Sequence, residues 1–95
     1  MKKPTLTTDE AQTVAIRAVE FLAGDDERLG RFLALTGVGP TDMAAGLSEP
    51  AFLAAIPDHV MSDETLLFLF CEHTGLEPDL PGAARRRLAG PGDAP

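Results

Sequence analysis

Glycines recur at the ends of short apolar segments, and this regular punctuation constrains the fold more than any other feature. Gly24, Gly37, Gly46, Gly75 and Gly90 each follow an apolar stretch, and Thr, Ser or Asp residues open the next stretch. Helices commonly end at glycine and begin at a small polar residue that accepts backbone N–H groups. No segment shows the alternation of β-branched residues that is typical of strands. The pattern predicts an all-α fold, a compact array of five or six short helices with no sheet.

The boundaries of the first two helices follow from their caps. Thr7 and Glu10 have the spacing of a capping box, so the first helix begins just after Thr7. Gly24 is expected to end it in the left-handed conformation, which glycine adopts at low cost. Asp25 is the expected N-cap of the second helix, which Gly37 ends.

Prolines and serines mark the later helices. Pro40 suits the first turn of a short third helix, and Ser48 is the expected N-cap of a fourth. Pro57 lacks an amide hydrogen, so we expect a kink or break in the fourth helix at this point. Ser62 is the expected N-cap of a fifth helix, and a turn at residues 77–79 precedes the last one.

The apolar stripes of these helices predict the core. The fifth helix is the most apolar segment, and we expect it to be central. The predicted core residues are Val14, Ala18, Leu22, Leu29, Phe32, Leu33, Phe52, Leu53, Ile56, Leu66, Leu67, Leu69 and Phe70.

A length of 95 residues fits one small domain, and a hydrophobic content of 44% is enough to build its core. We predict a flexible N-terminus at residues 1–6, a single helical domain at residues 7–89 and a disordered tail at residues 90–95. The start of the chain has basic residues without a following apolar run, and a single cysteine, Cys71, permits no intramolecular disulfide. The longest apolar run is far shorter than a membrane span. We therefore expect a cytoplasmic protein that does not enter a membrane.

The net charge weighs against polyanionic partners. Eight Lys and Arg residues stand against fifteen Asp and Glu residues, a formal charge of −7. Such a chain repels phosphate over most of its surface, which disfavours nonspecific binding to nucleic acid or to anionic lipid.

The order of several segments resembles a known family. An alanine-rich first helix is followed by residues 28–37 (RLGRFLALTG), then by residues 50–53 (PAFL) and by residues 62–64 (SDE), which open an apolar helix. Over nearly the whole chain, this order resembles a family of short bacterial proteins catalogued as domain of unknown function 3572. The resemblance implies an all-helical cytoplasmic domain in bacteria. It implies no activity, because the family has no assigned catalytic or binding residues.

The turn at Gly37, Val38 and Gly39 resembles the turn of helix-hairpin-helix DNA-binding modules, whose backbone amides contact a phosphate. Met43 stands where such motifs usually have alanine, and Asp42 follows the turn where basic residues would attract the phosphate. We favour the simpler interpretation, a helix end followed by a helix start. Nucleic-acid binding through this turn remains the alternative function.

Cys71, His73 and His59 are the candidates for chemistry. Cys71 and His73 are two residues apart on a helix and diverge, so they cannot readily share a metal ion. Each histidine is interpreted as a partly buried side chain bonded to a carbonyl. Cys71 lies near a helix C-terminus, which raises the pKa of a thiol. No motif for catalysis or nucleotide binding occurs. We therefore expect no catalytic residues, no cofactor and no metal site.

Phe68 does not fit the predicted core. With Glu64 and Glu72 at four-residue steps, it lies on the helix face opposite the one expected to be buried. Either the last helix covers it, or it is exposed and anchors a partner helix or a second copy of the chain.

Arg85, Arg86 and Arg87 form the only basic cluster. They fit the negative end of the last helix, and they could also dock an acidic partner or the protein's own acidic half. Together with Phe68, they predict a non-catalytic protein-interaction or regulatory module whose partner is another protein or a second copy.

Overall fold

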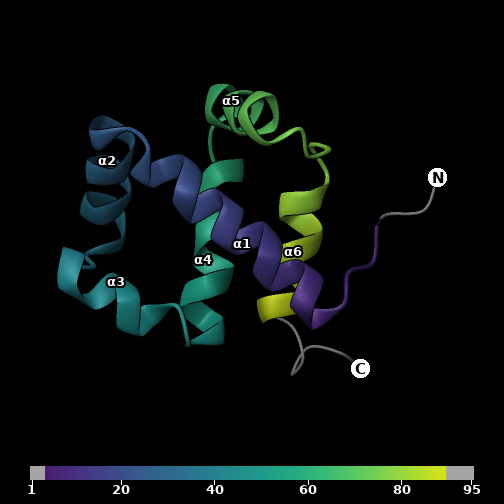
Figure 1. The fold of residues 1–95 in the computed structure, drawn as a ribbon, viewed down its shortest axis with the longest axis horizontal. Coiled ribbons are helices and arrows are strands. Elements are labelled where there is room, and N and C mark those ends of the chain that lie inside the picture. The colour runs from purple at the N-terminus through teal and green to yellow at the C-terminus, as the bar shows by residue number, and fades with distance from the viewer. Residues whose placement is uncertain (1–3, 90–95) are drawn as a thin grey trace.

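The computed structural model describes residues 4–89 and places six helices in them (Figure 1). The helices are α1 (Thr8–Ala23), α2 (Asp26–Thr36), α3 (Pro40–Gly46), α4 (Pro50–Met61), α5 (Glu64–Thr74) and α6 (Leu80–Ala89). The predicted all-α array is confirmed, since no residue from 4 to 89 lies in a strand. Residues 1–3 of the predicted flexible start and the whole predicted tail, residues 90–95, lie outside the described residues.

Three helices build the centre of the fold. Helix α1 runs diagonally across α4 and α6, and these three helices make most of the contacts between elements (Figure 1). Helices α2 and α3 lie to one side, and α5 lies across one end of the assembly. No helix within residues 4–89 is long and apolar enough to cross a membrane.

Helix α4, and not α5, is central. Leu53, Ile56 and Val60 of α4 are buried, whereas Phe70 is the only buried residue of α5. The prediction that the fifth helix is central is therefore wrong. The apolar character of α5 extends around the helix, but one side alone meets the rest of the molecule. Leu69 was predicted in the core and is 37% exposed, which corrects that prediction too.

The rest of the predicted core divides between full and partial burial. The buried members are Val14, Ala18, Leu22, Phe32, Leu53, Ile56 and Phe70, and the partly buried members are Leu29, Leu33, Phe52, Leu66 and Leu67. The predicted list lacks three large buried side chains, Phe21, Val60 and Leu88, and several small ones at or near complete burial, namely Ala11, Ala15, Ala83 and Ala84. Alanine brings helix backbones close together, so these positions mark the contact of α1 with α6 more directly than the large residues do.

The first two helix starts confirm the capping prediction. The Glu10 amide donates to Thr7 Oγ1 over 3.1 Å, and the Thr7 amide donates to Glu10 Oε1 over 2.8 Å. Asp25 caps α2, and Gly37 ends it in the left-handed conformation with φ of 74°. Gly24 is an exception, because its φ is −72° and its conformation is right-handed. The two-residue link to α2 needs no left-handed residue there.

Both serines predicted as N-caps instead form hydrogen bonds to the preceding helix. Ser48 Oγ donates to the Ala45 carbonyl over 2.9 Å, and Ser62 Oγ donates to the His59 carbonyl over 2.6 Å. In each case the next residue is the N-cap, so Asp63 rather than Ser62 starts α5. The hydroxyl of a serine in a short link can donate to a free carbonyl of the preceding helix or accept from a free amide of the next one. Here both hydroxyls donate to carbonyls.

Pro57 does not break α4. The helix continues through it to Met61, and Pro57 is buried. Of the predicted kink or break, the break is therefore wrong: packing against α1 and α6 stabilises the helix although proline removes one of its hydrogen bonds.

Two helical glycines give opposite expectations for substitution by alanine. A Cβ at Gly30 would meet nothing within 4 Å, so Gly30→Ala should raise the free energy of unfolding by about 0.5–1 kcal/mol. A Cβ at Gly46 would lie 2.8 Å from a Phe52 ring carbon, so Gly46→Ala should lower it by about 1–3 kcal/mol. Urea unfolding followed by circular dichroism measures both. Equal effects of the two substitutions would contradict the close packing of Phe52 on α3.

Candidate interaction site

An open groove of about 610 Å³ lies between α2 and α5, with the end of α4 between them. Its apolar lining consists of Leu35 from α2 and of Leu66 and Leu69 from α5. Leu35 is 67% exposed, more than any other large apolar side chain described. The groove therefore presents apolar surface to solvent that the fold itself does not use.

The N-caps of α2 and α5 bring negative charge to the groove, because Asp25 and Asp63 both line it. Asp25 Oδ1 accepts the amides of Glu27 and Arg28, and Asp63 Oδ1 accepts those of Thr65 and Leu66, over 2.8 to 3.1 Å. Each carboxylate lies at the positive end of its helix dipole, which offsets part of its charge.

The α2 side of the groove carries two arginines. The Arg28 guanidinium stacks over the Phe21 ring at 4.5 Å from its centroid, which fixes it against α1. Arg31 is exposed and lines the groove without an ion pair to any described residue. Arg31 is thus the positive charge in the groove that remains available to a partner.

His59 forms part of the groove at the end of α4. Its ring packs edge-on against Phe32, with the centroids 5.1 Å apart. Burial lowers the pKa of His59 and the nearby Arg31 charge lowers it further, against the smaller opposing effects of Asp58 and Asp63. The imidazole is therefore neutral at neutral pH, and it contributes shape rather than charge to the groove.

Phe68 lies on the outer side of α5 and is 62% exposed. The interpretation that the last helix covers it is wrong, because α6 packs against α4 and α1. Glu64 and Glu72, one turn to either side of Phe68, are exposed and form no ion pair with a described residue. These three side chains form an acidic and aromatic ridge, named the Phe68 ridge below. Its role as a partner contact remains a prediction.

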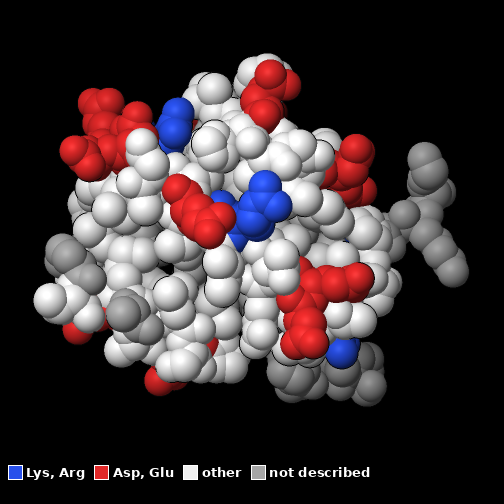
Figure 2. All heavy atoms as spheres, viewed as in Figure 1, with Lys and Arg blue, Asp and Glu red and all other residues white. Residues whose placement is uncertain are grey.

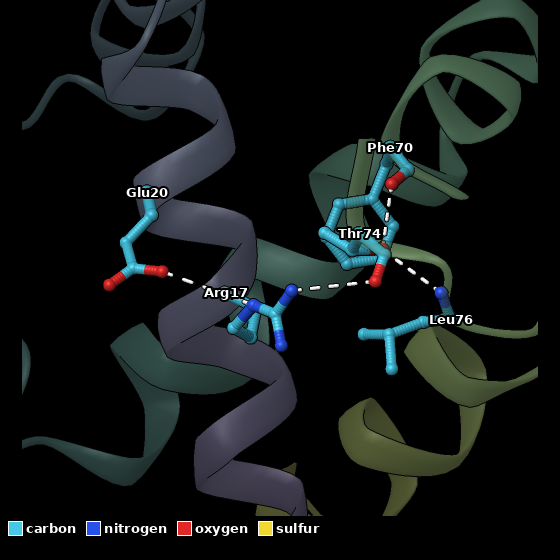
Figure 3. Close-up of polar contacts among 5 residues, drawn as sticks. All are labelled: Arg17, Glu20, Phe70, Thr74 and Leu76. Atoms are coloured by element: carbon cyan, nitrogen blue, oxygen red, sulfur yellow. Dashed lines mark hydrogen bonds and ion pairs between the residues drawn. The ribbon is translucent and has the colours of Figure 1, made fainter. Parts of the chain in front are cut away.

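The orientation of α5 is fixed by its contacts with α1. Phe70 packs edge-on against Phe21 with the ring centroids 5.6 Å apart. Arg17 donates from Nη2 to the Thr74 carbonyl over 3.4 Å, and Thr74 Oγ1 donates to Phe70 O and accepts from the Leu76 amide (Figure 3). The guanidinium thus lies at the negative end of the α5 dipole.

The arginine cluster of α6 is partly engaged within the fold. Arg85 Nε forms an ion pair with Asp58 Oδ1 at 2.9 Å, and Arg87 Nε donates to Thr8 Oγ1 over 3.3 Å. Arg86 has no ion pair with a described residue. Arg85 therefore contacts an acidic residue of the protein itself. Contact with the protein's own acidic half was one of the alternatives that the sequence left open for this cluster.

The turn at Gly37 has few free amides for a phosphate. The Gly37 amide donates to the Leu33 carbonyl over 2.9 Å, and the Val38 amide donates to Thr36 Oγ1 over 3.4 Å. Asp42 lies beside Gly39, so closely that a Cβ at that position would be 3.3 Å from Asp42 Oδ2. The local charge is negative where a phosphate would bind.

The remaining candidates for chemistry lie apart from one another. His73 is exposed, with its ring 5.6 Å from that of Phe21, so the expectation of partial burial holds for His59 but is wrong for His73. Neither imidazole forms a hydrogen bond with a residue from 4 to 89, against the expected bond to a carbonyl. Burial raises the pKa of the Cys71 thiol, as do Glu77 and Glu72. Within residues 4–89 no three His, Cys, Asp or Glu side chains group as metal ligands would.

The charge distribution agrees with the acidic composition. Figure 2 shows acidic side chains gathered over the start of α2 and spread over the rest of this face, with few basic side chains among them. This face of the molecule is therefore predominantly acidic.

The described residues, 4–89, define a small all-α protein of six helices with an open groove beside an exposed aromatic ridge. The model of the family "Protein of unknown function (DUF3572)" matches residues 8–91, and the chain belongs to this family. No curated protein and no solved structure matches the chain.

Arg17→Met should loosen α5. It removes the hydrogen bond to the Thr74 carbonyl and should lower the free energy of unfolding by about 1 kcal/mol. Amide hydrogen exchange should speed up most at the end of α5. Glu20→Gln is the control, because Glu20 touches only the guanidinium, at 4.0 Å. An equal effect of the two substitutions would show that the contact of Arg17 with α5 does not stabilise the helix.

His59 should make stability depend on pH. Its folded pKa lies below the ordinary value of 6.5, so its contribution to stability is present above pH 6.5 and is lost as the pH falls through the folded pKa. Between about pH 8 and pH 5, the wild-type free energy of unfolding should therefore fall more than that of His59→Gln. Other titrating groups are common to both proteins and cancel in the difference. Parallel pH profiles would refute the lowered pKa.

Proposed function

We propose that the protein is a non-catalytic, cytoplasmic protein-interaction module that binds a partner through the Phe68 ridge. The observation that carries the proposal is the 62% exposure of Phe68 on a helix that turns its other side to the core. A large aromatic side chain buries roughly 150–250 Å² when a partner covers it, so leaving it in water is costly without such a use.

Neighbouring side chains support this choice of surface. Leu69, the next residue of α5, is 37% exposed, and Leu35 of α2 is 67% exposed across the groove. A cluster of exposed apolar residues rimmed by charges is typical of a protein contact, whereas single exposed residues are common. Ile16 on α1 is 44% exposed but does not line the groove, and it serves as a control.

The proposal that the module is non-catalytic rests on the environments of the side chains that could take part in chemistry. His59 packs against an aromatic ring, and the raised pKa of Cys71 keeps the thiol protonated at neutral pH. The single cysteine is the sequence feature that favours the cytoplasm.

The proposal does not extend to nucleic acid. The net charge is −7, and two of the three amides of the Gly37 turn already donate within the protein. A phosphate at this turn would be repelled by the net charge and would find two of the three amides already engaged in hydrogen bonds.

Position-specific cross-linking in living cells tests the proposal. A photoreactive phenylalanine analogue replaces Phe68 in one variant and Ile16 in the other, and adducts are identified by mass spectrometry. We expect a discrete protein adduct at position 68, with a yield at least about tenfold higher than at position 16.

The adduct should also depend on the surrounding surface. Leu69→Asp, which places a charge beside the ridge, should reduce the yield at position 68 while the helical circular dichroism is unchanged. Equal yields at the two positions, or no adduct at either, would overturn the proposed function.

A further inference from the structure

The Phe68 ridge and the groove have complementary chemistry on one and the same chain. The ridge presents acidic, aromatic and acidic side chains at four-residue steps, a span of about 12 Å along α5. The α2 side of the groove presents Arg28, Arg31 and Leu35 over a similar length, about 10 Å. The ridge therefore offers negative charge and an aromatic ring, and the groove offers the Arg31 guanidinium and an apolar lining beside its own carboxylates.

Resting on the proposed function, we infer that the partner is a second copy of this chain, with the Phe68 ridge of each copy seated in the groove of the other. Such a reciprocal contact is the two-fold arrangement found in most homodimers. It covers the exposed rings and leucines of both surfaces at once, and it gives Glu64 and Glu72 a positive partner that they lack among residues 4–89.

Arg31 is the residue on which the inference depends most. Arg28 is held over the Phe21 ring, whereas Arg31 is exposed in the groove and free of ion pairs with described residues. A carboxylate of the second copy would find this charge beside the neutral ring of His59. The apolar lining formed by Leu35 and Leu69 lies within reach of the aromatic ring.

Two charge effects oppose the contact and determine its geometry. The carboxylates that line the groove, those of Asp25, Glu27 and Asp63, repel the ridge, so the glutamates must approach the groove through Arg31. The net charge of −7 on each copy also opposes association, and salt at physiological ionic strength screens most of this long-range repulsion.

Sedimentation velocity at physiological ionic strength measures the association. The wild type should show a reversible monomer–dimer equilibrium as its concentration rises from about 1 μM to about 1 mM. Phe68→Glu and Arg31→Glu should each raise the dissociation constant at least about tenfold. Ile16→Glu and Arg86→Glu are the matched controls, because they make the same changes at exposed positions outside the groove and the ridge; they should leave the constant within about twofold. Helical circular dichroism verifies that every variant is folded.

A charge exchange tests which surfaces meet. Arg31→Glu and the double variant Glu64→Arg with Glu72→Arg should each fail to form homodimers, because like charges then face each other. Mixed together, they should form a heterodimer with wild-type affinity, since each groove then faces a ridge of opposite charge. Failure of the mixture to associate would overturn the inferred contact.

The failure of this inference differs from the failure of the proposed function. A wild type that remains monomeric throughout, with a cross-linked adduct to a different protein at Phe68, would overturn the homodimer and leave the interaction module standing. No adduct at Phe68 would remove both.

Discussion

The packing of Phe70 against Phe21 is the interaction on which the candidate interaction site depends. Residues two apart on a helix point to nearly opposite sides, so burying Phe70 against α1 turns Phe68 outward. The contact of Arg17 with the Thr74 carbonyl holds the far end of α5 in the same rotation. One helix therefore divides its apolar residues between the core and the surface.

Electrostatics shape the site through the helix caps. Asp25 and Asp63 start α2 and α5 and both line the groove, so the residues that cap the two helices also bring negative charge to it. Farther along α2, Arg28 packs on the Phe21 ring, and Arg31 lies exposed in the groove. In a chain with a charge of −7, this exposed cation is a local exception, and under the proposal it attracts the acidic ridge of the second copy.

The sequence was sufficient for the helix order and most of the core, because caps and apolar periodicity are local properties. The capping box at Thr7 and the left-handed Gly37 follow directly from a few adjacent residues. The central position of α4 and the exposure of Leu69 depend on which helices meet, and apolar content alone does not encode that. Pro57 illustrates the same limit, since tertiary packing keeps α4 continuous through a residue that disfavours a helix.

Only part of the candidate site could be predicted from the sequence. The four-residue spacing of Glu64, Phe68 and Glu72 identified the ridge, although it left two interpretations of Phe68 open. The groove was not predicted, because its walls come from segments about 35 residues apart in the sequence. The one local signal is the spacing of Arg28, Arg31 and Leu35, which places them on one face of α2.

Solvent accessibility of the phenylalanine rings tests the central claim most directly. The chain has five Phe and no Trp or Tyr, so few aromatic proton signals overlap in a nuclear magnetic resonance spectrum. With a soluble paramagnetic agent, the proton signals of the Phe68 ring should broaden strongly in dilute protein. This broadening should decrease as the protein concentration rises, because the second copy covers the ring. The proton signals of the Phe70 ring should stay sharp at every concentration. Protection of Phe68 in dilute protein, or exposure of Phe70, would contradict the account.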